Sequence, residues 1–404
     1  YDARLDNGRY RYYRDPEILA GPLGARYVGD IDRMFDTYAE LLPRLQTWFA
    51  ERYPKEAGDS DFVYRQSIRA KALDSLRGLL PAASLSNVGI YGTGQGYEAL
   101  LLRLRANPLP EARAYGELML DELRKVIPSF LKRVDVPERG GAWSDYLAST
   151  RAATEAVAAR VFEGIDSEPR PEVTLVDWDP DGEDKVIAAM LYPYTNLPDD
   201  QLLARVRRMT ESERREVIRA YVGERTNRRH KPGRALERTA YRFDVLSDYG
   251  AFRDLQRHRL LTIEWQSLNP VHGYEVPEAV IDAGVGSEYE ESLARSAALY
   301  DAVAETAPTQ APYAVALAFK LRYSMQFNAR EAMHLLELRT GPQGHPTYRR
   351  VCQEMHRLIA GQAGHTAIAE AMQFVDHRTY DLERLDAERR AEARRGATQS
   401  PDFA

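Results

Sequence analysis

The strongest constraint on the fold is an approximate internal repeat. Segments 13–27 and 274–289 share a Pro-Glu pair, an apolar stretch and a glycine, and each precedes an amphipathic helical pattern. The similarity resumes at 96–105 and 330–339, which both end in Leu-Arg and lead through prolines into another helical pattern. A repeat with the same order of elements indicates a duplicated unit. The alternative is two amphipathic helix pairs that are alike by chance.

Composition narrows the class of protein. The chain has 404 residues, a formal net charge of -6 and one cysteine, Cys352. This length predicts two or three domains, and the acidic balance makes a nucleic-acid partner unlikely. A single cysteine excludes an internal disulfide framework and any multi-cysteine metal site. The sequence has neither an apolar run of membrane-spanning length nor a signal peptide, so we expect a cytoplasmic protein with no membrane partner, although the chain starts at Tyr1 rather than Met.

Breaks in the pattern suggest the domain organisation. The stretches 137–141 and 166–171 are rich in Pro, Gly and charge and are typical of linkers. Residues 172–178 and 239–245 alternate as strands do, whereas 184–190, 199–209 and 249–258 are predicted helices. We therefore predict a first copy at 1–135 that is incomplete at its start, a helical or linker connection at 136–171, a second copy at 172–375 and a charged tail at 376–404.

One short motif carries potential chemistry. Arg257, His258 and Arg259 are consecutive, and Ser267 follows after seven residues. Two guanidiniums beside an imidazole form a dense set of planar donors, which suits a pyrophosphate or an electron-rich ring. The alternative interpretation of the triplet is a solvated basic end of a helix.

Two further stretches join this motif to a known family. Asn328 to Arg339 reads Asn-x-Arg-Glu and then Leu-x-Leu-Arg, and Glu237 lies about twenty residues before the triplet, just ahead of a predicted strand. Over residues 173–360, roughly, the chain resembles the flavin-dependent (alternative) thymidylate synthases. The resemblance implies an α+β fold in which a sheet is flanked by long helices. For this chain it suggests two tandem synthase-like units, helix-rich overall.

The resemblance also implies an activity. Family members are homotetramers with FAD and nucleotide sites between subunits. They convert dUMP to dTMP by reductive methylation, using methylenetetrahydrofolate as the carbon source and NADPH as the reductant, without a cysteine nucleophile. Cys352 falls in a helical pattern that is typical of a buried structural thiol.

Individual residues take their implied roles from the family motifs. Arg339 matches the catalytic arginine that contacts the uracil ring, where a guanidinium stabilises negative charge developing on the pyrimidine. The positions that match FAD contacts are Glu237, Arg257, His258, Arg259, Asn328, Arg330 and His334. Arg330 and His334 are four residues apart and share a helix face, which a polar seam between helices would also explain.

The chain departs from the family at the substrate. Of the family loop Glu-x-Ser-x-Arg-Tyr only Ser267 remains, and the phosphate-binding arginine is missing near 311–313. The first copy instead contains Arg77 in the expected Arg-x-x-Leu-Pro pattern, but has the glycine-rich run 92–96 where Asn-x-Arg is expected, and its own loop would precede Tyr1. Arg105 is a suggested counterpart of Arg339. We hypothesise that the first copy supplies groups for the nucleotide phosphate and the second holds FAD, with a homodimer mimicking the family tetramer.

Three functions remain open on sequence alone. The first is an FAD-dependent thymidylate synthase-like enzyme. The second is a non-catalytic paralogue that binds FAD or a nucleotide in a structural or sensing role. The third, a nucleic-acid binder, has only local arginine clusters such as 225–234 in its favour. No metal site is predicted, because neither the other histidines nor the acidic run 179–184 has metal-ligand spacing.

Overall fold

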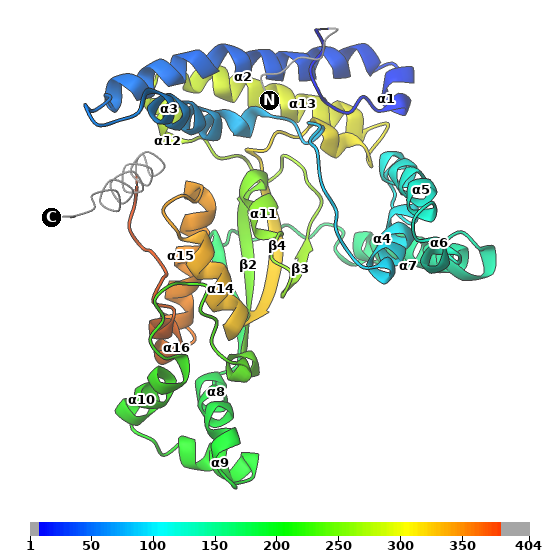
Figure 1. Ribbon diagram of the computed structural model, residues 1–404. Helices are drawn as coiled ribbons and strands as arrows, with labels where there is room; N and C mark the ends of the chain where they lie inside the picture. The colour runs from blue at the N-terminus through cyan, green and yellow to red at the C-terminus, as the bar shows by residue number, and fades with distance from the viewer. Residues whose placement is uncertain (1–7, 381–404) are drawn as a thin grey trace, which may run out of the picture.

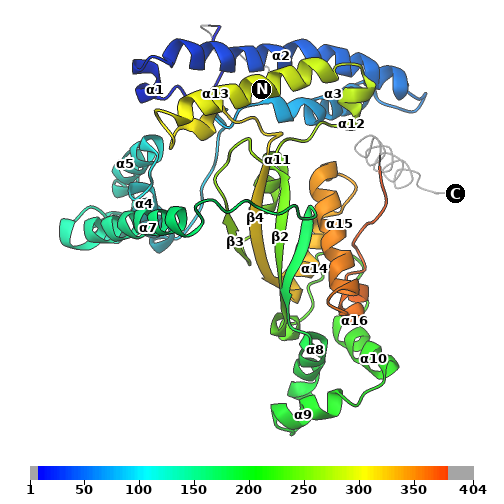
Figure 2. The ribbon, with the colours of Figure 1, turned by 180° about the vertical axis from the view of Figure 1, so that it is seen from behind.

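The computed structural model describes residues 8–380, and within them the protein is an α+β structure, as predicted (Figure 1). A single four-stranded antiparallel sheet stands below a layer of long helices. Further helices cover one face of the sheet and extend beyond its lower end, and a separate group of helices lies to one side (Figures 1 and 2).

The sheet comes entirely from the second half of the chain. Its strands are β1 (Val173–Trp178), β2 (Ala240–Asp248), β3 (Thr262–Trp265) and β4 (Lys320–Asn328), in the order β1-β2-β4-β3. The central pair runs in unbroken register from Ala240 opposite Asn328 to Asp248 opposite Lys320. Alternate residues of β4 are buried, which is the pattern of a strand covered on one face. The strands predicted at 172–178 and 239–245 are confirmed, whereas β3 and β4 were not predicted.

Helices of the second half form the main core with this sheet. Their bounds are α8 (Gly182–Leu191), α9 (Asp199–Val206), α10 (Glu211–Val222), α11 (Tyr249–Leu255), α14 (Ala329–Arg339), α15 (Pro346–Gly361) and α16 (Thr366–Ala371). The apolar side chains of α14 and α15 pack with buried strand residues such as Phe243, Tyr323 and Met325. The helix predicted at 249–258 ends at Leu255, so Arg257, His258 and Arg259 follow the helix rather than end it.

The helical layer contains the first helices of both predicted copies. It contains α1 (Pro16–Ala20), α2 (Gly24–Arg52), α3 (Asp61–Leu76), α12 (Glu278–Asp282) and α13 (Gly286–Ala304). The two Pro-Glu segments begin the short helices α1 and α12, and each of these precedes a long helix, α2 or α13. These long helices share one core, in which Tyr27 and Tyr289 are fully buried. This part of the repeat therefore corresponds to similar structures that pack against each other.

The remaining part of the first half has no sheet. Helices α4 (Gly94–Arg105), α5 (Pro110–Arg124), α6 (Pro128–Leu131) and α7 (Ala142–Val161) lie to the side, around a small core of Leu101, Leu120, Leu131 and Val134. Between 8 and 135 the described chain has no strand, so the sheet expected in the first unit is not found there. The stretch 84–93, which precedes α4 as β4 precedes α14, is largely exposed and contains two glycines, Gly89 and Gly92. Such a segment lacks the buried alternation that a strand needs.

Short helical turns complete the description. They are 3₁₀ turns at 77–79, 192–194, 234–238 and 311–314 and a π turn at 137–141, while the predicted linker 166–171 has no regular structure. Of the predicted charged tail, 376–404, residues 381–404 lie outside the described residues. Among the helices of residues 8–380, none combines the length and apolarity needed to cross a membrane.

Candidate functional site

A basic cavity opens where the start of α14 meets the ends of β2 and β4. Its volume is about 680 Å³. Its lining combines cationic and apolar side chains with two carboxylates: Arg228, Lys231, Arg234 and Arg330; Leu260, Leu261, Phe327 and Met333; and Glu237 and Glu331. A cavity of this composition suits a ligand that carries both an anionic group and an apolar ring.

Four of the seven predicted FAD contacts line this cavity: Glu237, Asn328, Arg330 and His334. The Arg330 Nη1 atom lies 3.2 Å from Glu237 Oε1, and its Nε donates to the Pro232 carbonyl at 3.0 Å. The hydrogen bond from Arg234, supported by Arg330, lowers the pKa of Glu237. Asn328 caps α14 by accepting a hydrogen bond from the Glu331 amide. The geometry thus joins motifs that lie about 90 residues apart.

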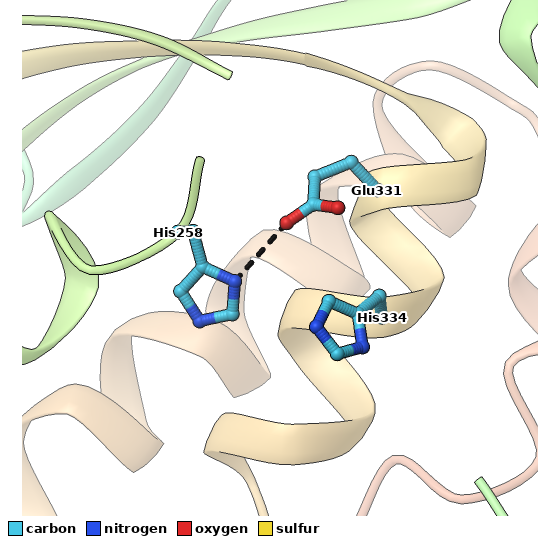
Figure 3. A group of neighbouring side chains, drawn as sticks. All are labelled: His258, Glu331 and His334. Atoms are coloured by element: carbon cyan, nitrogen blue, oxygen red, sulfur yellow. Dashed lines mark hydrogen bonds and ion pairs between the residues drawn. The ribbon is translucent and has the colours of Figure 1, made fainter. Parts of the chain in front are cut away.

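Behind the cavity wall, His258 meets two residues of α14 (Figure 3). Its Nδ1 lies 3.0 Å from Glu331 Oε1, and its ring centroid is 5.6 Å from that of His334. Burial lowers the pKa of His334. Ligand atoms of these three residues lie within 4.8 Å of one another, a spacing that a metal ion can bridge. Sequence spacing did not predict this group. However, Arg339 already donates to His258 Nε2, and the cationic cavity disfavours a further cation.

A second cluster of charges surrounds Asp254, on α11. Three guanidiniums face this carboxylate: those of Arg77 at 3.8 Å, Arg257 at 3.6 Å and Arg339 at 3.6 Å. The Asp254 and Arg339 side chains are only 18% and 13% exposed, and Arg77 Nη2 is buried without a hydrogen-bond partner in the described structure. Burial raises the pKa of Asp248, and the charge of Arg77 opposes this shift. Three guanidiniums thus meet two carboxylates, which leaves an excess of positive charge. The predicted substrate residue Arg77 and the predicted catalytic residue Arg339 therefore come together from the two segments predicted to be copies.

A buried ion pair holds the loop that carries Arg228 and Lys231 of the cavity lining. Arg225 donates two hydrogen bonds of 2.6 Å to the carboxylate of Glu337, and both side chains are almost completely buried. Arg225 also donates to the carbonyls of Arg228 and His230. The arginine cluster 225–234 is thus partly structural, because its first member anchors the loop that places Arg228 and Lys231 at the cavity.

Other predicted residues lie outside the cavity. Arg257 is 70% exposed, and Arg259 is exposed after the end of α11. Ser267 is exposed on the loop that follows β3, where its carbonyl accepts a hydrogen bond from Asn269. Arg105 pairs with Glu117 of α5 rather than with any residue of this site. Cys352 is buried as predicted, and burial raises the pKa of its thiol to about 12.

Sequence reasoning did not assign a role to Asp254, Glu331, Arg228 or Lys231. Asp254 had a detectable signal, since it lies three residues before Arg257 and the helix predicted at 249–258 would place both on one face. Glu331 was recognised only as part of a motif. Arg228 and Lys231 belonged to an arginine-rich stretch whose orientation depends on the pair between Arg225 and Glu337.

Comparison with known proteins agrees with these motifs. Residues 174–363 match the family model Thy1, described as thymidylate synthase complementing protein. A UPF0159 protein of Chlamydia muridarum is 38% identical over 97% of this chain and 74% of its own length, and one of Chlamydia pneumoniae is 36% identical over 97% and 73%. The chain belongs to the UPF0159 protein family. The match of residues 174–363 to the thymidylate synthase complementing protein model supports a thymidylate synthase-like function.

The family model and the relatives cover different parts of the chain. The model matches only the half that contains the sheet and the cavity, whereas the chlamydial relatives also align with the helices of the first half. Among solved structures, a UMP/dUMP methylase, PolB from Streptomyces cacaoi, bound with 5-Br dUMP is similar at a TM-score of 0.39 and 20% identity, over 50% of this chain and 97% of that one.

Proposed function

We propose that this UPF0159 protein converts dUMP to dTMP by reductive methylation. FAD would bind in the cavity, methylenetetrahydrofolate would supply the carbon and NADPH the reducing equivalents. One observation carries the proposal: the cavity and the Asp254 cluster are joined through Glu331, His258 and Arg339. A cofactor pocket and a cluster suited to a nucleotide are thus contiguous.

The residues of the cavity fit a flavin dinucleotide. Arg228, Lys231 and Arg330 offer cationic donors for a pyrophosphate, and the apolar side chains of the lining offer a surface for a planar ring. Glu237 and Asn328 would hold polar edges of the cofactor, as the family motifs imply. When bound, FAD would supply the hydride chemistry that the side chains of this protein cannot perform.

The Asp254 cluster fits the nucleotide. Its excess positive charge suits a phosphate monoester, which arginines bind as planar forked donors. We assign phosphate binding to Arg77 because its Nη2 is buried without a hydrogen-bond partner in the described residues. Arg339, held beside it, would face the pyrimidine and stabilise the negative charge that develops on the ring. No role falls to Cys352, whose thiol is buried.

This arrangement supports the hypothesis of divided labour. Arg77 belongs to the first copy of the repeat and Arg339 to the second, so one chain combines groups that the resemblance assigns to different subunits. We further propose that two such chains form a homodimer, which would provide two composite sites. The proposed division of the chain at residues 135, 171 and 375 follows the same scheme.

The first experiment is an absorbance spectrum of the purified full chain, followed by anaerobic reduction with NADPH in the presence and absence of dUMP. We expect bound flavin, and faster flavin reduction when dUMP is present. Bound flavin that responds to neither NADPH nor dUMP would instead support the non-catalytic paralogue, which the exposed, altered loop at Ser267 favours. A preparation that neither contains nor takes up flavin would contradict the enzyme and the flavin-binding form of the paralogue.

A matched pair of variants locates the cofactor. Arg330→Ala removes a cation from the cavity wall and should lower the amount of flavin that copurifies. Arg105→Ala removes an arginine from the equivalent helix of the first copy, where it pairs with Glu117 on the surface, and should leave the flavin content unchanged. Equal flavin loss in both variants would contradict the placement of the site.

A further inference from the structure

We infer that Glu331 is a positioning residue that acts through His258 to hold the guanidinium of Arg339 in one orientation. The inference rests on the proposed function, in which Arg339 faces the pyrimidine. It assigns Glu331 a role that neither the family motif nor its place on the helix specifies. Figure 3 shows its carboxylate directed at the imidazole of His258.

The setting of Glu331 is unusual for a carboxylate. Its side chain is 4% exposed, and the ion pair recorded for it is with His258 rather than with an arginine or a lysine. Glu337, six residues later on the same helix, forms the more common arrangement for a buried carboxylate, a bidentate pair with Arg225. A buried carboxylate without a permanent cation is costly. The first turn of α14 offsets part of this cost, because the amide dipoles there favour negative charge.

The hydrogen bonds around His258 determine its tautomer. Arg339 Nε lies 3.0 Å from His258 Nε2, and a guanidinium can only donate. The Nε2 atom must therefore accept, and the proton of the neutral ring lies on Nδ1. That Nδ1–H donates to Glu331 Oε1 at 3.0 Å. Glu331 thus favours the one tautomer of His258 that can accept from Arg339.

Two further contacts hold Arg339. Its Nη2 donates to the Asp254 carbonyl at 2.5 Å, and its guanidinium carbon lies 5.3 Å from the centre of the Tyr348 ring. Nη1 is less constrained, since its ion pair with Asp254 Oδ1 spans 3.6 Å. Nη1 is therefore the atom that can donate to a ligand. Because the guanidinium is planar, the hydrogen bonds of Nε and Nη2 determine the direction of Nη1.

Removing Glu331 should disturb orientation more than binding. Without the carboxylate, the two neutral tautomers of His258 become closer in energy, and the Nε2–H form cannot accept from Arg339. The guanidinium would then lose one of its two short hydrogen bonds. Partners that orient a functional group in this way contribute about 10- to 100-fold to activity. Since phosphate contacts remain, the loss should appear in kcat rather than in the KM for dUMP.

The test compares Glu331→Leu with Glu331→Gln, whose amide oxygen still accepts from Nδ1–H. We expect kcat to fall about 10- to 100-fold in Glu331→Leu with little change in the dUMP KM, and most of the loss to be recovered in Glu331→Gln. Asp15→Asn is the control for a buried carboxylate outside both clusters, because Asp15 is buried at the N-cap of α1; it should lower stability without this selective fall in kcat. A Glu331→Leu variant with wild-type kcat, or one that loses only stability, would overturn the inference.

A second readout requires neither flavin nor turnover. Nitrogen-15 spectra of histidine-labelled protein, with the His258 signal assigned through His258→Gln, should show Nδ1 protonated in the wild type and a mixture of tautomers in Glu331→Leu. If the wild type fails to turn over dUMP but shows this change, the proposed function fails and the positioning role stands. Unchanged His258 signals in Glu331→Leu, or a stoichiometric metal bound by His258, Glu331 and His334, would overturn the role.

Discussion

Helices α4 and α14 are the predicted counterparts in the sequence repeat, yet only α14 lines the candidate site. Both end in Leu-Arg and both begin at a side-chain cap, from Thr93 or from Asn328. Seven of the 11 residues of α14 are buried, including Glu331 and Glu337. In α4, of 12 residues, only Leu101 is buried. Similar sequence patterns have thus produced one helix that organises a core and another that covers a small satellite cluster.

The segment before each helix accounts for the difference. α14 follows β4, whose register with β2 places Asn328 opposite Ala240, so the first turn enters the molecule at a defined position. α4 follows the exposed stretch 84–93. Its start is shaped by local packing instead, because a side chain at Gly94 would collide with the ring of Phe130. A functional helix therefore needs a fixed entry point as well as the right residues.

The largest difference in unfolding free energy should come from two glutamates that pair with arginines, Glu337 of α14 and Glu117 of α5. Glu337→Ala leaves Arg225 buried without its partner and should cost about 3–5 kcal/mol of unfolding free energy. Glu117→Ala breaks the exposed pair with Arg105 of α4 and should cost about 0–1 kcal/mol. Denaturant unfolding measures both values. Equal losses would mean that α4 is more deeply integrated than its exposure indicates.

The next largest difference concerns activity and the two arginines that end the helices, Arg339 of α14 and Arg105 of α4. Arg339→Ala should slow dTMP formation about 100- to 1,000-fold, because it removes the group proposed to stabilise charge on the pyrimidine. Arg105→Ala should change this rate by less than about twofold, since Arg105 contributes only a surface ion pair. Product formation at saturating NADPH and methylenetetrahydrofolate compares the two. A comparable loss in Arg105→Ala would restore it as a second catalytic arginine.

The same contrast shows how far sequence alone can lead. Alternation predicted β1 and β2, and the family motifs predicted that Glu237, Asn328, Arg330 and His334 would meet. The pairing of Arg77 with Asp254 was beyond reach, because it depends on how the helical layer packs against α11. The contact between Glu331 and His258 was equally hidden, since a turn after α11 rather than a helix carries His258. The first copy lost its expected sheet because its pattern around 84–93 does not alternate.

Mild acid, near pH 5, should act more on the α14 side of the molecule than on the α4–α7 group. Burial and the charge of Arg77 lower the pKa of His345 to about 3, while residues 94–161 contain no histidine. Between pH 6.5 and 3 the unfolded state binds a proton that folded His345 does not, so stability falls as pH decreases through this range, by about 2 kcal/mol at pH 5 for this one group. His345→Gln should flatten the dependence of unfolding free energy on pH by up to one proton. An unchanged pH slope would exclude His345 as its source.

The smallest difference in stability should come from the side chains that cap the two helices, Asn328 for α14 and Thr93 for α4. Asn328 accepts from the Glu331 amide at 2.9 Å, and Thr93 accepts from the Gly96 amide at 3.1 Å. Asn328→Ala should cost about 1–2 kcal/mol, because it also releases the turn that aims Glu331 at His258, whereas Thr93→Ala at an exposed end should cost about 0.5 kcal/mol. Hydrogen exchange of the first-turn amides would follow each helix separately. If Asn328→Ala frays α14 without altering the His258 tautomer, the strand rather than the cap directs Glu331, and the difference between the two helices lies wholly in β4.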